Sequence, residues 1–463
     1  MPSIFSRSSL AYSVGMALAI GQHYAVAAPL NGSSATLNNG DPVETWQLSN
    51  GATLNVNDAS TLAITATTGS TVNLNANASV LATGRALSIN QSVANVAGAR
   101  IESTGTFGMV LSTDLAGTPG TAATVSDSTV TGIARGISSA YSSLVLSNTQ
   151  VHGIDNGATG ILNGGLGLLM VAGSADVTNG SQILGDKNGI LVVTDPGSPN
   201  QTATLTIDNS TVIGTGSSAI AVGSLFSTFP ASADITVRNG SSLTGGDGAI
   251  LSVTNNSTAS LTVDNSRLTG DVSIEDGSSG TLALRNGASL AGNISNVSTV
   301  DVTNNSSTTG NINQAQTITV SNNATVSGNV SNVQDLNVSA NSELNANLSG
   351  VTRLSLDNSR WTTTDGQGVT DLAMNAGTVK LGSAGGTFET LNVSTLSGSG
   401  RFIMDTDLGA HQSDLVNVSG VATGTYDLQI TNTGVDPVKG DQDQQVVHTG
   451  TGSTAGFAVV GGQ

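Results

Sequence analysis

A five-residue pattern recurs along the chain and limits the folds that it can adopt. The pattern is apolar-x-apolar-x-Asn, and its copies begin at Leu205, Ile235, Leu261, Leu282, Val300, Ile318 and Leu354. Between Leu282 and Leu354 the spacing is 18 residues four times in succession, through Leu336. Weaker copies begin at Leu144 and Ala175, where longer spacings indicate inserted loops. A repeat of this length, with alternating apolar residues, is typical of a solenoid built from β-strands.

The second half of each repeat keeps the same step. Gly292-Asn293-Ile294, Gly310-Asn311-Ile312 and Gly328-Asn329-Val330 lie 18 residues apart. Each unit therefore offers two or three short strands with one buried face, joined by turns, and shows no helical periodicity. The sequence predicts an all-β fold, a right-handed parallel β-helix in which every coil stacks on the next.

Two inward-facing columns follow from the register of this β-helix. The first is expected to contain Leu282, Val300, Ile318, Leu336 and Leu354, and the second Leu284, Val302, Val320, Val338 and Leu356. Both columns consist of aliphatic side chains, which are the residues that a sheet buries on its inner face. These columns are the predicted core.

The Asn residue that closes the first strand of a repeat also forms a row, namely Asn286, Asn304, Asn322 and Asn358. Asn tolerates the left-handed backbone conformation that a tight turn needs, and its side chain can hydrogen-bond nearby groups. Stacked at the strand spacing of about 4.8 Å, such side chains can bond one another as a ladder. We expect a structural role for this row and an interruption at Ala340.

Composition and charge exclude several classes of protein. The 463 residues are uniform in composition from about residue 30 onward, which favours one repetitive body over three separate domains. Apolar residues make up 37% of the chain, enough to bury one row per repeat and so to argue against disorder. The net charge of −18, with only 13 basic residues, argues against nucleic-acid binding. The chain has no Cys, so its stability must come from continuous strand ladders instead of disulfides.

The first 27 residues have the features of a secretory signal peptide. Arg7 supplies the positive charge, the segment from Leu10 to Ile20 is apolar, and Ala25-Val26-Ala27 supplies small residues for cleavage before Ala28. No later stretch approaches the roughly 20 apolar residues of a membrane helix. We therefore expect three segments: residues 1–27 as signal peptide, 28–375 as β-helix repeats, and 376–463 as a distinct carboxyl-terminal part.

The segment from Gly377 to Gly434 resembles the carboxyl-terminal passenger segment of pertactin-like autotransporters, which Gram-negative bacteria secrete by the type V route. Several matching stretches occur in one order, including Ser413-Asp414-Leu415 and Val418-Ser419-Gly420. The motif residues are Leu391, Val393, Leu396, Gly398, Gly400, Phe402, Met404, Asp407 and Leu408.

The resemblance implies that residues 376–463 are a stable folding core, or autochaperone, which folds first and caps the β-helix at its membrane-proximal end. Larger apolar residues also concentrate there: Phe388, Phe402, Ile403, Met404, Tyr426 and Phe457. It further implies export through the periplasm to the outer-membrane surface or the medium. Family members continue into a translocator barrel, whereas this chain ends at Gln463. A fragment of a longer product and a freely secreted passenger both remain open.

Residues that could carry chemistry are sparse. His152, His411 and His448 have no second His or Cys at metal-ligand spacing, so neither a metal nor a cofactor is predicted. The Ser-Gly-Ser-Gly stretch at 397–400 lies in the expected folding core and favours a turn over a nucleophile. Asp365 stands alone, while Asp405 and Asp407 would point the same way on a strand. No catalytic residue is therefore predicted.

The function that remains is binding. Autotransporter passengers of this kind imply an adhesin or virulence-associated binding protein, with a host cell, matrix or another bacterial surface as the partner. Contact is expected in the longer inserted loops, Leu111–Ala123, Asp195–Thr204 and Ser224–Ala233, because loops on a rigid scaffold commonly carry binding. Lys439-Gly440-Asp441 is expected to be a turn and not a receptor motif.

Two alternatives stay open. One is a β-helical polysaccharide-active enzyme that uses Asp365 or Asp407. The other is an adhesin of another secretion route, either two-partner or trimeric.

Overall fold

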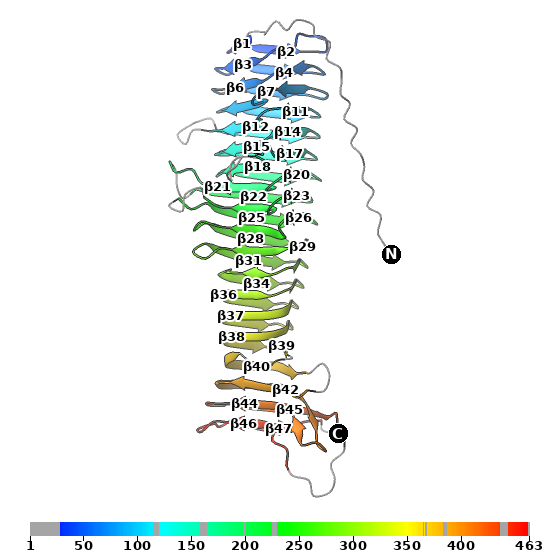
Figure 1. Ribbon diagram of the computed structural model, residues 1–463, viewed down its shortest axis with the longest axis vertical. Coiled ribbons are helices and arrows are strands. Elements are labelled where there is room, and N and C mark those ends of the chain that lie inside the picture. The colour runs from blue at the N-terminus through cyan, green and yellow to red at the C-terminus, as the bar shows by residue number, and fades with distance from the viewer. Residues whose placement is uncertain are drawn as a thin grey trace.

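The computed structural model describes residues 28–113, 120–157, 164–197, 201–224, 229–363, 365, 368–382, 387–435 and 443–461. Every regular element in these ranges is a β-strand. The strands stack into one long column with the amino-terminal coils at one end and the carboxyl-terminal coils at the other (Figure 1). The predicted fold is confirmed: the chain is a right-handed parallel β-helix.

The amino-terminal coils contain short strands. They are β1 (Ala28–Asn31), β2 (Ser34–Leu37), β3 (Trp46–Ser49), β4 (Thr53–Val56), β5 (Ser60–Thr61), β6 (Ile64–Ala66), β7 (Thr71–Leu74), β8 (Ser79–Ala82), β9 (Leu87–Asn90), β10 (Val93–Ala97), β11 (Arg100–Ser103), β12 (Phe107–Ser112), β13 (Thr121–Ser126), β14 (Thr129–Ile133), β15 (Arg135–Ala140), β16 (Ser142–Ser147) and β17 (Gln150–Ile154).

The middle coils keep three strands per turn. They contain β18 (Leu166–Val171), β19 (Ser174–Thr178), β20 (Gln182–Gly185), β21 (Ile190–Val193), β22 (Thr202–Asp208), β23 (Thr211–Gly214), β24 (Ile220–Val222), β25 (Ser232–Arg238), β26 (Ser242–Gly245), β27 (Ala249–Val253), β28 (Thr258–Asp264), β29 (Arg267–Thr269), β30 (Asp271–Ile274), β31 (Ser279–Arg285), β32 (Ser289–Ala291), β33 (Ile294–Ser295), β34 (Thr299–Thr303) and β35 (Ser307–Thr309).

The carboxyl-terminal coils contain longer strands. They are β36 (Ile312–Ser321), β37 (Thr325–Ser339), β38 (Glu343–Asp357), β39 (Arg360–Thr363), β40 (Val369–Leu381), β41 (Thr390–Val393), β42 (Thr395–Asp407), β43 (Gln412–Ser413), β44 (Leu415–Val418), β45 (Thr425–Asn432), β46 (Val447–Thr449) and β47 (Gly456–Val459).

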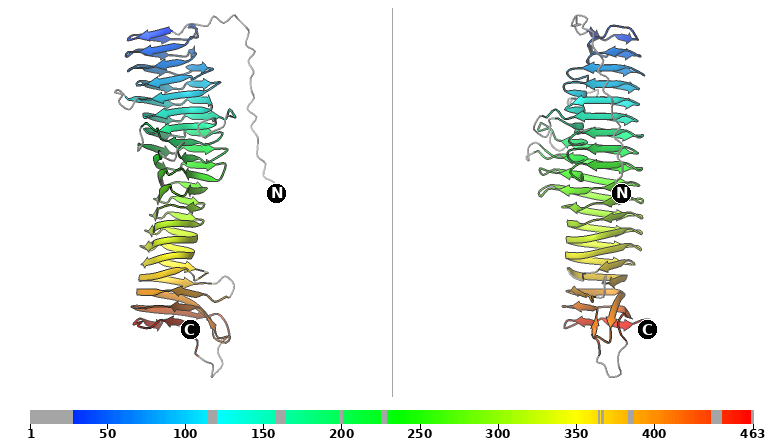
Figure 2. Two further views of the ribbon diagram at one scale, coloured as in Figure 1. Left: turned by 60° about the vertical axis from the view of Figure 1, so that its left-hand side comes forward. Right: turned by 45° about the vertical axis from the view of Figure 1, so that its right-hand side comes forward.

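Almost all strand pairs are parallel, and each joins a strand to its counterpart one coil later. In the middle coils, for example, β28 pairs with β31, β29 with β32, and β30 with β33. The exception is the antiparallel pair of β42 with β43. Each coil is therefore three-sided, and the three faces become three ladders that run the length of the column (Figure 2).

The predicted core columns are confirmed. Leu282 pairs with Val300, Val300 with Ile318, Ile318 with Leu336, and Leu336 with Leu354. The second column, from Leu284 to Leu356, has the same register, and all ten side chains are buried. One continuous apolar cluster extends from Leu37 to Leu428. The largest fully buried side chain is that of Trp361, whose indole nitrogen donates to the Ala346 carbonyl at 2.9 Å.

The expected boundary between residues 375 and 376 does not coincide with a break in the structure. It lies inside β40, which stacks on β38 on one side and on β42 on the other. A register shift between Asn375 and Gly377 is the local irregularity there. Residues on both sides of the boundary belong to the same apolar cluster. The carboxyl-terminal coils thus continue the β-helix.

The expected signal peptide, with Ala25 and Ala27, lies outside the described residues, and Ala28 begins β1. Within the part of the chain that the structure describes, no helix is long and apolar enough to cross a membrane.

Candidate functional site

The predicted Asn row lies at one corner of the coil, where the first strand ends. Asn286, Asn304, Asn322 and Asn358 have φ values of 56°, 56°, 59° and 45°, all in the left-handed region. The Asn322 amide nitrogen donates to the Asn304 side-chain oxygen at 3.1 Å, and Asn304 donates to Asn286 at 3.5 Å. The row thus turns the chain and links the side chains of successive coils.

At Ala340 the row shifts by one residue. Ala340 itself adopts φ 52°, and Asn358 donates to the Asn341 side chain at 2.9 Å. Asn341 therefore takes the place that Ala340 cannot fill. Above Asn286 the row ends on a carboxylate, because Asn286 donates to both oxygens of Asp264 at 3.0 Å.

Five apolar motif residues of the carboxyl-terminal segment are buried in the core. Leu391 and Val393 are buried on β41, and Leu396, Phe402 and Met404 are buried on β42. Phe402 and Met404 lie on the same face of β42 because they are two residues apart, beyond the bend at Gly398. This part of the resemblance marks the interior of the last coils.

The glycines of the motif pack tightly against the coil before them. A Cβ atom on Gly398, whose φ is 100°, would meet the Met374 carbonyl oxygen at 1.9 Å. A Cβ atom on Gly400 would lie 2.5 Å from the Gly377 carbonyl oxygen. Both positions therefore exclude any side chain.

Asp407 and Leu408 occupy the end of β42, where the chain turns back into β43. The Asp407 carboxylate accepts the Ala410 N–H at 3.0 Å, and the Leu408 N–H donates to the Asn432 side chain at 3.2 Å. Both side chains are half-buried. Their contacts shape this hairpin.

Three aromatic rings stack through the last coils. The ring centroids of Phe402 and Tyr426 are 5.7 Å apart, and those of Tyr426 and Phe457 are 5.4 Å apart. The Tyr426 hydroxyl donates to the Thr423 carbonyl at 2.8 Å, and burial raises the pKa of Tyr426 to about 12. Such pairs add about 0.5–1.5 kcal/mol beyond their buried area, so the stack strengthens the end of the column.

A buried carboxylate holds the same coils together. Asp414 is 2% exposed and accepts two backbone N–H groups, from Glu389 at 2.8 Å and from Asp405 at 2.7 Å. Burial raises the pKa of Asp414, although the two hydrogen bonds act in the opposite direction. Asp414 belongs to a stretch that resembles the family, but its bonds to these two backbone N–H groups were not predicted. The signal that could have revealed this role was a single Asp directly before the apolar strand β44.

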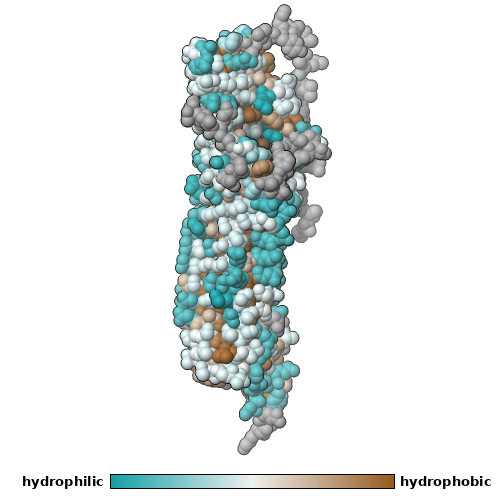
Figure 3. Space-filling model, turned by 90° about the vertical axis from the view of Figure 1, so that its left-hand side faces the viewer, coloured by the Kyte–Doolittle hydropathy of each residue, from teal (hydrophilic) through white to brown (hydrophobic). Residues whose placement is uncertain are grey.

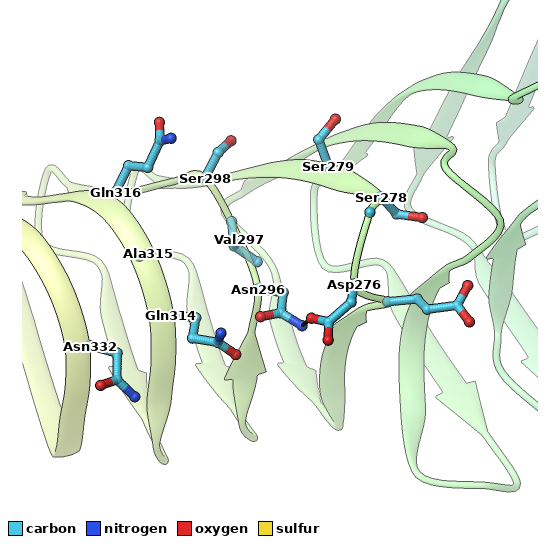
Figure 4. Close-up of a pocket in the computed structure, with 12 residues that line it drawn as sticks. Asp276, Ser278, Ser279, Asn296, Val297, Ser298, Gln314, Ala315, Gln316 and Asn332 are labelled. Carbon is cyan, nitrogen blue, oxygen red and sulfur yellow. Dashed lines mark hydrogen bonds between the residues drawn. The ribbon is translucent and has the colours of Figure 1, made fainter.

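A groove follows another corner of the coil, where the third strand turns into the first strand of the next coil. We call it the corner groove. One part of it has a volume of about 510 Å³ and is lined by residues 275–279, 296–298, 314–316 and Asn332. Figure 4 shows Asn296, Gln314 and Asn332 along one side of the groove and Ser279, Ser298 and Gln316 along the other.

The groove exists because the backbone bends sharply at one residue in each coil. Asn296, Gln314, Asn332 and Gly350 have φ values of 57°, 60°, 56° and 64°. The next residue in each coil then points inward, so that Val297, Ala315, Val333 and Val351 form a buried column beneath the groove.

The same corner is hollow again nearer the carboxyl terminus. A second cavity, of about 250 Å³, is lined by Gly350, Gly368, residues 369–370, 392–394, Asn417 and Ser419. Asn417 donates there to the Asn392 side chain at 2.7 Å. Polar side chains therefore extend along this flank of the column. On the face in Figure 3, the lower half of the column is mostly of intermediate hydropathy, with hydrophilic surface along its edges and a hydrophobic strip between them.

The comparisons with known proteins concern mainly the carboxyl-terminal coils. Residues 369–463 match the family model described as Pertactin. The Autotransporter CRAC of Citrobacter rodentium (strain ICC168) is 48% identical over 69 residues, covering 15% of this chain and 4% of that protein. The Autotransporter adhesin/invasin TibA of Escherichia coli O78:H11 is 46% identical over 74 residues, covering 16% of this chain and 7% of that protein. The Probable autotransporter YcgV of Escherichia coli (strain K12) is 38% identical over 93 residues, covering 18% of this chain and 10% of that protein.

Residues 369–463 are therefore a pertactin-like autotransporter passenger domain. Such passengers are exported to the outer-membrane surface or secreted, so the expected localisation holds. The matched segments span at most 10% of the length of the three relatives. Among solved structures, the Haemophilus influenzae Hap adhesin is 14% identical with a TM-score of 0.36, covering 91% of the passenger and 62% of that chain. The autotransporter UpaB of E. coli strain CFT073 is 15% identical with a TM-score of 0.26, covering 92% of each chain.

The histidines of the passenger lie in separate settings. His152 contacts Asp186 at 2.9 Å, His411 occupies a turn with φ 55°, and His448 contacts the Asn417 side chain at 3.0 Å. Among the described residues, no group of three or more His, Cys, Asp or Glu side chains is arranged to hold a metal ion.

The other candidate residues are also dispersed. Asp365 is exposed beside the end of β39, and Asp405 and Asp407 are half-buried on β42. The stretch 397–400 lies inside β42 and not in a turn, because β42 bends at Gly398 without ending. That correction leaves its serines on a strand of the last coils.

The expected contact loops lie partly outside the described residues. Their described ends belong to strands or short bends at Leu111–Thr113, Asp195–Gly197 and around Ser224. Lys439, Gly440 and Asp441 lie wholly outside. The corner groove was not predicted, because its bends fall on three residue types, Asn, Gln and Gly. The 18-residue spacing of Asn296, Gln314 and Asn332 could have revealed it.

Proposed function

We propose that the passenger is a surface-exposed or secreted binding protein, that is, an adhesin, and not an enzyme. The observation that carries this proposal is the corner groove, a polar surface that continues over several coils of a rigid stack. Binding sites built on rigid elements lose little conformational entropy when a ligand is held. The name of the relative TibA, an adhesin/invasin, adds support. The proposed partner is a host cell, extracellular matrix or another bacterial surface.

We also propose that an outer-membrane translocator barrel delivers the passenger, as the family implies. The stacked carboxyl-terminal coils, with their aromatic rings and buried Asp414, would then be the part nearest the membrane.

Surface display tests the adhesin proposal. The passenger is fused to a translocator barrel and displayed on a non-adherent bacterium, and attachment to cultured epithelial cells and to matrix-coated plates is counted. We expect attachment above that of the same bacterium displaying the barrel alone. Equal attachment, with the passenger detected on the surface by antibody, would refute the proposal.

The alternative of a polysaccharide-active enzyme has its own test. Incubation of the purified passenger with a panel of polysaccharides should release no reducing ends or unsaturated products. Turnover that disappears in Asp365→Asn or Asp407→Asn would establish the enzyme instead.

A further inference from the structure

The corner groove has a repeating lining, one set of side chains per coil. Its outer wall carries Ser298 and Gln316, and the sequence places Gln334, Thr352 and Thr370 at the equivalent positions of the next coils, 18 residues apart. Its inner wall carries Asn296, Gln314 and Asn332, which also recur every 18 residues. An extended ligand that lies along the column axis would therefore meet the same kinds of groups at every coil.

The lining consists of amides and hydroxyls and is almost free of charge. Glu275 and Asp276 at one end are the only ionisable residues among those that line the two cavities. No Arg or Lys is present among those lining residues, so an anionic polymer would find no counter-charge there. Amide and hydroxyl groups both donate and accept hydrogen bonds, which suits a ligand rich in hydroxyl groups.

Part of this hydrogen-bonding capacity is unused. The Ser278 hydroxyl is shielded from solvent and has no partner among the described residues. By contrast, Asn296 is held in place, because its amide nitrogen donates to the Ile274 carbonyl at 2.9 Å and to Asp276 at 3.1 Å. The groove thus holds at least one amide in a fixed position, whereas a ligand reaches the Ser278 hydroxyl only if its surroundings move.

The spacing of the coils distinguishes between two kinds of extended ligand. Successive coils are about 4.8 Å apart, whereas side chains on one face of an extended peptide recur about every 6.7 Å. A peptide would therefore lose register with the groove within two coils. One pyranose ring of a linear polysaccharide spans a length close to one coil, so successive rings can meet successive coils.

We propose that the corner groove binds an extended, uncharged polysaccharide chain that lies along the column axis. This inference rests on the proposed binding function and names the ligand class of the groove. The lining of the two cavities holds no aromatic ring on which a sugar could stack, so each ring contributes little and affinity grows with the number of coils engaged. Long chains should therefore bind much better than short oligosaccharides.

Affinity electrophoresis of the purified passenger tests the proposal. Native gels contain laminarin, mannan or dextran as neutral probes, and heparin as the anionic probe. We expect at least one neutral polysaccharide to retard the protein and heparin to leave its mobility unchanged. Retardation by heparin alone, or by none of the probes, would overturn the proposal.

Matched variants connect the binding to the groove. In the groove variant, Gln314→Gly keeps the left-handed turn and Gln316→Ala removes the opposite amide. In the control variant, Ser327→Ala and Asn345→Ala alter two residues on another face that pair in register. We expect the groove variant to bind about tenfold more weakly, since two hydrogen bonds are lost, and the control to bind within about twofold of the parent. Equal losses in both variants would overturn the assignment to the groove.

Circular dichroism and thermal unfolding of both variants verify that each is folded. The two proposals fail in different ways. If the groove variant no longer binds polysaccharide but the displayed passenger never promotes attachment, the adhesin proposal fails alone. If attachment is strong and no neutral polysaccharide binds, the ligand class of the groove is wrong and the adhesin proposal stands.

Discussion

Single buried hydroxyls show where the core of this passenger is not optimal. Thr308 is 1% exposed, lies between Leu290 and Val326 of neighbouring coils, and has no hydrogen-bond partner among the described residues. Thr308→Val replaces that hydroxyl with a methyl group of similar size. We expect the free energy of unfolding to rise by about 1 kcal/mol, because an unpaired buried hydroxyl is removed. Urea unfolding followed by circular dichroism measures the change.

Thr149→Val is the matched control for this prediction. The Thr149 hydroxyl is equally buried but donates to the Val125 and Ser147 carbonyls, at 3.1 and 2.9 Å. Its loss should destabilise the protein by about 1 kcal/mol. A change of the same sign in both variants would contradict the argument.

Two substitutions at one residue of the Asn row distinguish the contribution of side-chain hydrogen bonds from that of backbone conformation. Asn304 adopts φ 56° and bonds to Asn286 and Asn322. Asn304→Gly removes the side-chain bonds and keeps the turn, whereas Asn304→Ala also places a Cβ atom in a left-handed conformation. We expect the Ala variant to be less stable than the Gly variant by about 1 kcal/mol. If the two variants unfold at the same urea concentration, backbone conformation is not what selects Asn here.

Asp414 should make the last coils more stable in mild acid. Burial raises its pKa above the usual 3.8, so the folded protein binds this proton more tightly than the unfolded chain does. Linkage then requires this contribution to stability to fall as pH rises from 3.8 through the folded pKa. We expect the free energy of unfolding of the carboxyl-terminal coils to fall as the pH rises over that window. Asp414→Asn should make this dependence on pH weaker. Hydrogen exchange of β42 and β45 at several pH values measures this stability. If its dependence on pH were the same in Asp414→Asn, Asp414 would not be its source.

At the scale of strands, the register could be predicted and the corners could not. The 18-residue spacing fixed the columns from Leu282 to Leu354 because a parallel coil of constant length must place equivalent residues above one another. The sequence did not predict that β37 and β38 would each run for 15 residues. Their corners bend at Asn332 and Gly350 without interrupting the ladder, so turn residues were taken as strand ends.

The candidate sites also contain features that the sequence could predict and features that it could not. The larger apolar residues were expected to add buried area in the last coils; Phe402, Met404 and Tyr426 are buried there, whereas Ile403 and Phe457 are half-buried. The clamp at Asp414 and the corner groove depend on contacts between coils, and a polar residue in one coil does not specify what lies above or below it. Stacked contacts become predictable only where equivalent positions repeat the same chemistry, as the Asn row does.

Gly398 is one of the glycines that allow close packing between β40 and β42. A Cβ atom on Gly398 would meet the Met374 carbonyl oxygen at 1.9 Å, so Gly398→Ala must push the two strands apart. Gly287→Ala is the control, since φ is also positive, at 77°, but nothing lies within 4 Å. We expect the control to lose about 1 kcal/mol and Gly398→Ala to lose several times more. Thermal unfolding compares them, and equal losses would show that β42 can shift at little cost.

The whole column is continuous, so its folding order depends on where buried area per coil is largest. The aromatic stack of Phe402, Tyr426 and Phe457 gives the last coils larger side chains than the aliphatic coils before them. In a solenoid each coil contacts only its neighbours, and folding spreads from the most stable region. If the carboxyl-terminal coils are that region, as the family resemblance implies, weakening them should slow folding of coils far away.

Tyr426→Ala tests this at the level of the whole molecule, with Leu54→Ala as the control at the opposite end. Both side chains are buried, at 2% and 0% exposure. After dilution from denaturant, we expect Tyr426→Ala to delay protection of amides throughout the column, including β7 and β10, by about tenfold or more, because loss of a nucleus slows folding. Leu54→Ala should affect only the coils around β4. A delay confined to β42, β45 and β47 in Tyr426→Ala would mean that the column folds from another point, and that the last coils act as a cap alone.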